Sequence, residues 1–148
     1  MYKTLDESMS AFRPQKEKTG NLPHLSSIPR KPESLGTEAK TGACAKTKIM
    51  LHFEIQKGKE AMKDTEYHTE LGATAACTLR LALAMKWCGR RAEEERKRDI
   101  FICDSWFGSV KTAEALHREN MDVIGNVKTA HKNCPLKVSK ISCIYHTL

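Results

Sequence analysis

The sequence predicts an α/β fold in which a mixed sheet is flanked by helices. Three strand-like runs alternate with two helix-like segments, in the order 48–58, 71–87, 100–103, 109–120 and 121–129. Strands that alternate with helices in this way usually belong to one sheet with right-handed parallel connections. We therefore expect parallel pairing in the second half of the chain.

The first strand-like run, KIMLHFEIQKG at residues 48–58, alternates and is rich in Ile, Leu and Phe. This pattern favours a strand that ends at Gly58. The segment 71–87 instead repeats its apolar residues every four positions, at Ala75, Leu79, Leu83 and Trp87. Such spacing predicts a helix, and its small number of charges predicts burial on most sides.

The stretch IFICDSWFGSVKT, residues 100–112, places one carboxylate at the end of an apolar run. In open sheets, functional groups collect at the carboxyl ends of strands, and Asp104 takes that position. Asp6 follows the short stretch YKTL, which places it on a first strand by the same pattern. Two carboxylates brought together there would repel unless a divalent cation lay between them. The pattern indicates a metal site for phosphodiester chemistry, with a simple strand-end cap as the alternative for Asp104.

Two aromatic residues, Trp106 and Phe107, follow Asp104 directly. We expect them to pack beneath the strand end and to fix the turn into the next helix. The same packing would fix the direction of Asp104, which a metal ligand needs from the residues around it.

The charge of the chain suits a polyanionic partner. With 148 residues it fits one domain, and its 25 Lys and Arg against 18 Asp and Glu give a formal net charge of +7. Residues 13–47 hold most of the prolines and read as a basic loop. Its cations are candidates for DNA phosphate contacts, a solvated loop being the alternative: Arg13, Lys16, Lys18, Arg30 and Lys31. Residues 90–99, RRAEEERKRD, read as a solvated connection.

Neither a long apolar run nor a signal peptide is present, so we expect an intracellular protein without a membrane span. The six cysteines form no CxxC pair and are expected to be reduced. One HxxC…CxxH arrangement could offer zinc four ligands: His131, Cys134, Cys143 and His146. The simpler interpretation makes Cys143 a buried strand residue.

Three motifs resemble the transposase domain of piggyBac-type transposable elements and their derived proteins: LDESMSAFRP at 5–14, CDSWFGS at 103–109 and IGNVK at 124–128. The resemblance runs across nearly the whole chain. In that family the first catalytic aspartate lies in a DE(Q/S)M-like strand, which corresponds here to Asp6. The second lies in a CD(N/S)WF motif, which corresponds here to Asp104.

The resemblance implies an RNase H-like fold in which three acids bind two Mg²⁺ or Mn²⁺ ions, with Asp6 and Asp104 as metal ligands. It also implies cut-and-paste transposition at TTAA sites, with the DNA of transposon ends as partner and the nucleus as the place of action. A homodimer is left open.

The family's third catalytic aspartate falls after the IGNVK-like strand, beyond an insertion, and residues 1–148 end before it. We therefore expect a partial catalytic domain that is inactive alone. Two alternatives stay open: a non-catalytic transposon-derived remnant, with or without DNA binding, and an unrelated metal-dependent nuclease on the same fold.

Overall fold

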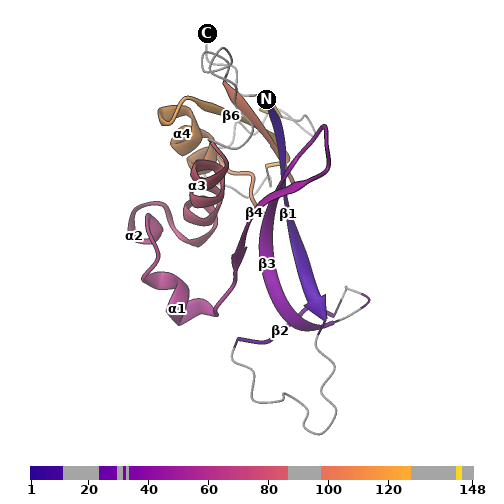
Figure 1. The fold of residues 1–148 in the computed structure, drawn as a ribbon. Helices are drawn as coiled ribbons and strands as arrows, with labels where there is room; N and C mark the ends of the chain where they lie inside the picture. Colours follow the sequence, from indigo (N-terminus) through magenta and orange to yellow (C-terminus); the bar gives the residue numbers. More distant parts are fainter. Residues whose placement is uncertain (12–23, 30–31, 33, 87–97, 128–142, 145–148) are drawn as a thin grey trace, which may run out of the picture.

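A mixed sheet organises the chain in the computed structural model, which describes residues 1–11, 24–29, 32, 34–86, 98–127 and 143–144. The strand order is β2-β3-β1-β5-β6-β7, and β4 also pairs with β3 (Figure 1). Strand bounds are β1 Tyr2–Ala11, β2 Ser26–Ser27, β3 Leu35–Cys44, β4 Met50–Ile55, β5 Asp99–Cys103, β6 Met121–Gly125 and β7 Cys143–Ile144. Strand β1 is antiparallel to β3 and parallel to β5, which is parallel to β6. The predicted mixed sheet is confirmed, and so is parallel pairing for β5 and β6, whereas β7 is antiparallel to β6.

Four helices are present in the described part of the chain: α1 Lys59–Lys63, α2 His68–Leu71, α3 Ala73–Met85 and α4 Val110–Arg118. The helix predicted at 71–87 begins only after Gly72, because Gly72 has a positive φ of 80° and is the N-cap of α3. Gly58, with a φ of 83°, precedes α1 in the same way. None of these helices is long and apolar enough to cross a membrane.

Helices α3 and α4 cover one face of the sheet (Figure 1). The core lies between them and the strands, with Leu81, Met85 and Leu116 packed in one cluster with sheet residues. Along β1 and β5, buried and more exposed positions alternate, as expected for side chains that point to opposite faces. The buried, helix-facing positions are Lys3, Leu5, Asp99, Phe101 and Cys103.

The loop predicted for residues 13–47 was wrong over β3, which pairs with β1 from Gly36 to Cys44. Its helix-facing positions are buried, apart from the partly buried Glu38, although none carries a large apolar side chain: Gly36, Lys40, Gly42 and Cys44. Hydrophobic alternation is therefore missing from its sequence. At Gly42 a Cβ would come within 2.3 Å of Met85 side-chain atoms, so the small residue allows α3 to approach the sheet.

The charged connection predicted for residues 90–99 was wrong at Asp99, which begins β5 and is 1% exposed. Lys3, fully buried on β1, donates from Nζ to Asp99 Oδ2 at 2.8 Å and to the Met85 carbonyl oxygen at 2.6 Å. A single ammonium thus joins β1, β5 and the end of α3. The rest of the predicted connection, up to residue 97, lies outside the described residues.

Helix α3 is also attached to β4. The Arg80 guanidinium donates to both carboxylate oxygens of Glu54, from Nε at 2.8 Å and from Nη2 at 2.7 Å. Two parallel bonds of this kind restrict the orientation of the pair as well as its distance. The partly buried fork therefore orients α3 against the edge of the sheet.

Replacing Lys3 should show how much the buried ammonium stabilises the fold. Lys3→Met removes a donor from Asp99 and from Met85, and breaking a buried ion pair costs about 3–5 kcal/mol of unfolding free energy. Urea unfolding followed by circular dichroism measures this loss. Lys111→Met, at an exposed position of α4, should change the value by less than about 0.5 kcal/mol. A Lys3→Met loss as small as that of the control would contradict the assignment.

Candidate functional site

The two aspartates singled out in the sequence lie side by side in the strand register. The parallel pairing of β1 with β5 ends at Leu5 and Cys103; Asp6 is the next residue of β1, and Asp104 is the first residue after β5. Both are exposed, whereas Leu5 and Cys103 are buried. Adjacent strands lie about 4.8 Å apart, so the two aspartates occupy neighbouring backbone positions.

Asp6 differs from its predicted position in one respect: β1 continues through it to Ala11 rather than ending there. The continuation is the antiparallel pairing with β3, in which Asp6 lies opposite Thr41. The pairing of β1 with β5 ends one residue earlier, at Leu5. Asp6 is therefore anchored on one side by a strand and open on the other, the side of Asp104.

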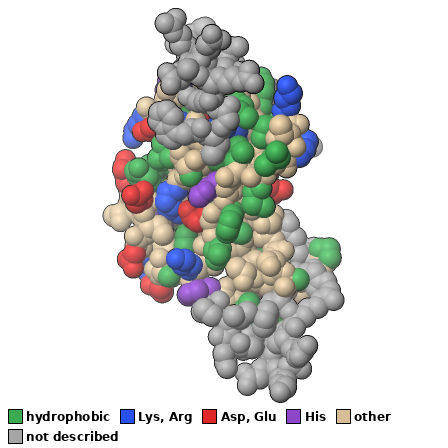
Figure 2. Space-filling view, viewed as in Figure 1, with side chains coloured by type: hydrophobic (Ala, Val, Ile, Leu, Met, Phe, Trp, Pro, Cys, Tyr) green, Lys and Arg blue, Asp and Glu red, His purple; other side chains and the backbone are tan. Residues whose placement is uncertain are grey.

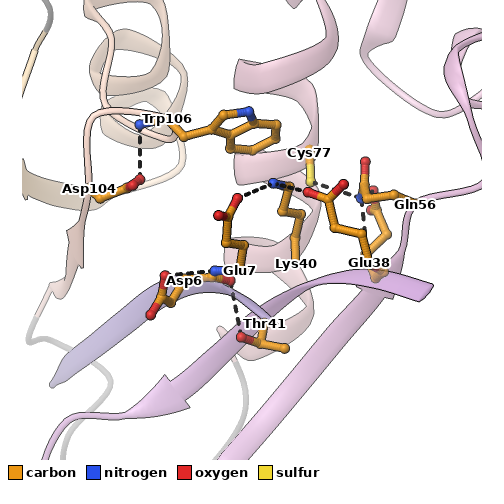
Figure 3. Close-up of polar contacts among 10 residues, drawn as sticks. Asp6, Glu7, Glu38, Lys40, Thr41, Gln56, Cys77, Asp104 and Trp106 are labelled. Carbon is orange, nitrogen blue, oxygen red and sulfur yellow. Dashed lines mark hydrogen bonds and ion pairs between the residues drawn. The ribbon is translucent and has the colours of Figure 1, made fainter. Parts of the chain in front are cut away.

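Each carboxylate accepts one hydrogen bond from a nearby backbone amide. Glu7 N–H donates to Asp6 Oδ1 at 2.8 Å, and Trp106 N–H donates to Asp104 Oδ1 at 2.9 Å (Figure 3). Among the described residues, Oδ2 of either carboxylate has no hydrogen-bond partner. The amides hold one oxygen in place, and the other can bind a ligand.

The turn after Asp104 is fixed by packing and by a close backbone approach. Phe107 is 1% exposed and belongs to the core, and the Trp106 ring meets it edge-on with centroids 4.7 Å apart. Gly108 N–H donates to the Asp104 carbonyl oxygen at 3.0 Å. A Cβ on Gly108 would come within 2.4 Å of the Asn126 carbonyl oxygen, so only glycine fits this turn unchanged.

Helix α4 begins directly after this turn. Ser109 is its N-cap, and its Oγ accepts a hydrogen bond from Thr112 N–H at 3.1 Å. The cap of α4 is therefore Ser109, which leaves Asp104 outside the helix start. The alternative reading of Asp104 as the cap of the following helix is wrong.

A thiol lies directly before Asp104. Burial, and to a lesser degree the charge of Asp104, raises the pKa of Cys103 to about 12. A raised pKa favours the neutral thiol, so Cys103 stays protonated throughout the physiological pH range. Cys103 therefore contributes to this edge of the sheet as a buried, neutral side chain.

A buried cation that the sequence reasoning missed lies beneath the site on the helix-facing side. Lys40 of β3 is 2% exposed, and its Nζ lies 2.6 Å from Glu38 Oε1 and 3.2 Å from Glu7 Oε2 (Figure 3). The same Nζ lies 3.7 Å from the centroid of the Trp106 ring. A usable signal was present, because Glu38 and Lys40 are two residues apart and so share one face of a strand.

The donor set of the two aspartates suits a hard divalent cation. Carboxylate oxygens are the ligands that Mg²⁺ and Mn²⁺ prefer, and one oxygen of each aspartate is available. The described residues contain no cluster of three or more His, Cys, Asp or Glu able to hold a metal ion. Asp6 and Asp104 would therefore hold a cation together with water or substrate oxygens.

Several predicted site residues lie outside the described part of the chain. These include all of the basic candidates for DNA contact: Arg13, Lys16, Lys18, Arg30 and Lys31. His131, Cys134 and His146 of the zinc hypothesis lie outside it as well. Cys143 begins strand β7, in agreement with the simpler interpretation, but its side chain is not described.

The fold of the chain is similar to that of solved transposase structures. The chain resembles piggyBac transposase in a synaptic complex with hairpin DNA, with a TM-score of 0.69 and 22% identity, over 90% of this chain and 24% of that one. The Mos1 mariner paired-end complex with Mn follows with a TM-score of 0.43 and 20% identity, over 82% of this chain and 34% of that one. The first likeness supports the RNase H-like fold class. The chain spans about a quarter of the length of that transposase.

Among curated proteins, none shows a significant sequence match. A family model described as Transposase IS4, of the DDE type, matches residues 2–143. That match covers nearly the whole chain and includes both aspartates, and it confirms the predicted kinship with transposase domains. The chain therefore belongs to the IS4-type family of DDE transposases.

Proposed function

We propose that this chain forms part of the catalytic domain of a piggyBac-type DNA transposase, and that Asp6 and Asp104 bind its divalent cations. The observation that carries the proposal is the register of β1 and β5, which sets the two aspartates at adjacent positions just past their last paired residues. Their exposure and their available oxygens support the same role.

The bound Mg²⁺ or Mn²⁺ ions would supply activation of the attacking oxygen and stabilisation of the leaving oxygen in phosphodiester cleavage and strand transfer. The part of this chain is to hold two carboxylates on rigid neighbouring strands. The backbone amides of Glu7 and Trp106 orient them, so that little movement is needed when a cation arrives.

Transposition belongs to the proposal for the whole protein, because this chain spans about a quarter of the solved piggyBac transposase. The family resemblance implies a site of three acids, of which Asp6 and Asp104 are two, together with TTAA target sites. Two carboxylates with substrate phosphates can bind Mg²⁺, but they form an incomplete two-metal cage. Metal binding is therefore the property to measure on this chain.

DNA is the proposed partner, since a net charge of +7 favours a polyanion. The charge is unevenly spread: Figure 2 shows acidic side chains along the margin formed by α1 and α2. The exposed acids of this region are Glu60, Asp64, Glu66 and Glu70. Exposed lysines lie among these acids, at Lys57, Lys59 and Lys63, so the margin carries no net positive charge. We propose the basic segment 13–31 as the DNA contact instead.

Metal binding should depend on both aspartates. Asp6→Asn and Asp104→Asn should each weaken Mn²⁺ binding by about tenfold or more, because even residues that only support metal ligands contribute that much. Titration followed by electron paramagnetic resonance of free Mn²⁺ gives the affinities.

The matched control is Asp64→Asn, which removes an exposed carboxylate at the end of α1 and should leave the affinity unchanged. Absence of Mn²⁺ binding by the wild-type chain, or equal binding by Asp104→Asn, would favour the non-catalytic remnant instead.

DNA binding should be salt-sensitive and should depend on the basic segment. With several phosphate contacts, affinity should fall about a thousandfold between about 50 and 200 mM salt. Alanine at Arg13, Lys16, Lys18, Arg30 and Lys31 should weaken binding and make the log–log salt slope shallower by about 4. Fluorescence anisotropy with a duplex oligonucleotide measures both effects.

The control replaces five exposed lysines elsewhere, which keeps the change in net charge the same: Lys46, Lys48, Lys57, Lys59 and Lys63. Its salt slope should stay close to that of the wild type. An equal loss in both variants would mean that net charge alone, and not the 13–31 segment, drives binding.

A further inference from the structure

Lys40 is buried in a charged cluster that stability alone does not require. Its ammonium lies between the carboxylates of Glu7 and Glu38, whose side chains are 10% and 18% exposed. Removing such charges from water costs several kcal/mol per ion, and well-packed apolar residues often stabilise a fold as well or better. We therefore examine whether this buried cation, with its two acidic partners, fixes the positions of the residues around it.

The cluster reaches Asp6 through β1 and β3. Lys40 lies opposite Glu7 in the register, and Asp6 lies opposite Thr41. Glu7 supplies the amide that donates to Asp6 Oδ1, and Thr41 Oγ1 donates to the Asp6 carbonyl oxygen at 3.0 Å (Figure 3). The ion pair thus holds the residue whose amide orients the first carboxylate.

The same ammonium reaches Asp104 through Trp106. Its Nζ lies 3.7 Å from the Trp106 ring centroid, which is within the range of a cation–π interaction, and 5.8 Å from that of Phe107. Trp106 supplies the amide that donates to Asp104 Oδ1. One cation therefore contacts both residues whose amides orient the two carboxylates.

We propose that Lys40 is a positioning residue, which fixes the Asp6 and Asp104 carboxylates relative to each other from the opposite face of the sheet. It touches neither carboxylate and acts through Glu7 and Trp106. The inference rests on the proposed function only for its consequence, metal affinity. Its structural content, the control of two backbone amides by one buried ammonium, can be measured without metal.

The two amides are the readout. In ¹⁵N-labelled protein without metal, Lys40→Met should move the proton signals of the Glu7 and Trp106 amides upfield, as their hydrogen bonds to Asp6 and Asp104 lengthen. Mn²⁺ affinity should fall about tenfold, as for other residues that support metal ligands. Lys40→Arg keeps a cation over the ring and should lie closer to the wild type in both measurements.

Lys40→Met leaves two acids without their shared cation and can unfold the chain, so a second variant is measured beside it. Glu7→Gln/Glu38→Gln/Lys40→Met removes all three charges at similar volume. It should fold, and it should still shift the Trp106 amide and weaken Mn²⁺ binding. The matched control is Glu60→Gln/Lys63→Met, which removes an exposed ion pair on α1 and should change neither readout.

An unmoved Trp106 amide in the folded triple variant, or an unchanged Mn²⁺ affinity, would overturn the proposal. If the wild-type chain binds no Mn²⁺, the proposed function fails, and the amide signals alone decide the role of Lys40. Loss of Mn²⁺ affinity with both amides in place would also count against it, because the effect would then not pass through Glu7 and Trp106.

Discussion

The parallel register of β1 against β5 is the constraint on which the candidate site depends. These strands are far apart in sequence, and their pairing alone brings Asp6 beside Asp104. A slip by one residue would turn one of the two carboxylates toward the helix layer, because side chains alternate between faces. The buried Lys3–Asp99 ion pair opposes such a slip, because a shift by one residue would place the two charges on opposite faces of the sheet.

Three cationic side chains connect the strands of the sheet to neighbouring elements. Lys3 joins β1 and β5 to the end of α3, Arg80 joins α3 to β4, and Lys40 joins β1 and β3 to the turn after β5. Apolar packing supplies most of the stability but is tolerant of small shifts. Ion pairs and hydrogen bonds depend on direction, and here they occur where strand register and turn geometry matter.

The elements with a clear hydrophobic period could be predicted from the sequence, and those whose buried positions carry charges could not. The spacing of Leu79 and Leu83 was enough for α3, and the apolar run before Asp104 was enough for β5. Strand β3 has Lys40 buried where a pattern search expects an apolar residue. Its long-range pairing with β1, which no local pattern contains, decides its structure.

The chemical groups available at the candidate site follow from the alternation of side chains between the two faces of a strand. Because Cys103 and Asp104 are consecutive, one side chain faces the core and the other faces outward. The thiol is buried and its pKa is raised to about 12, so the neutral thiol faces the core. The outward positions offer only carboxylate oxygens. A strand that kept its register but exchanged these two residues would bury the acid and expose the thiol, and a site for hard cations would be lost without any change in composition.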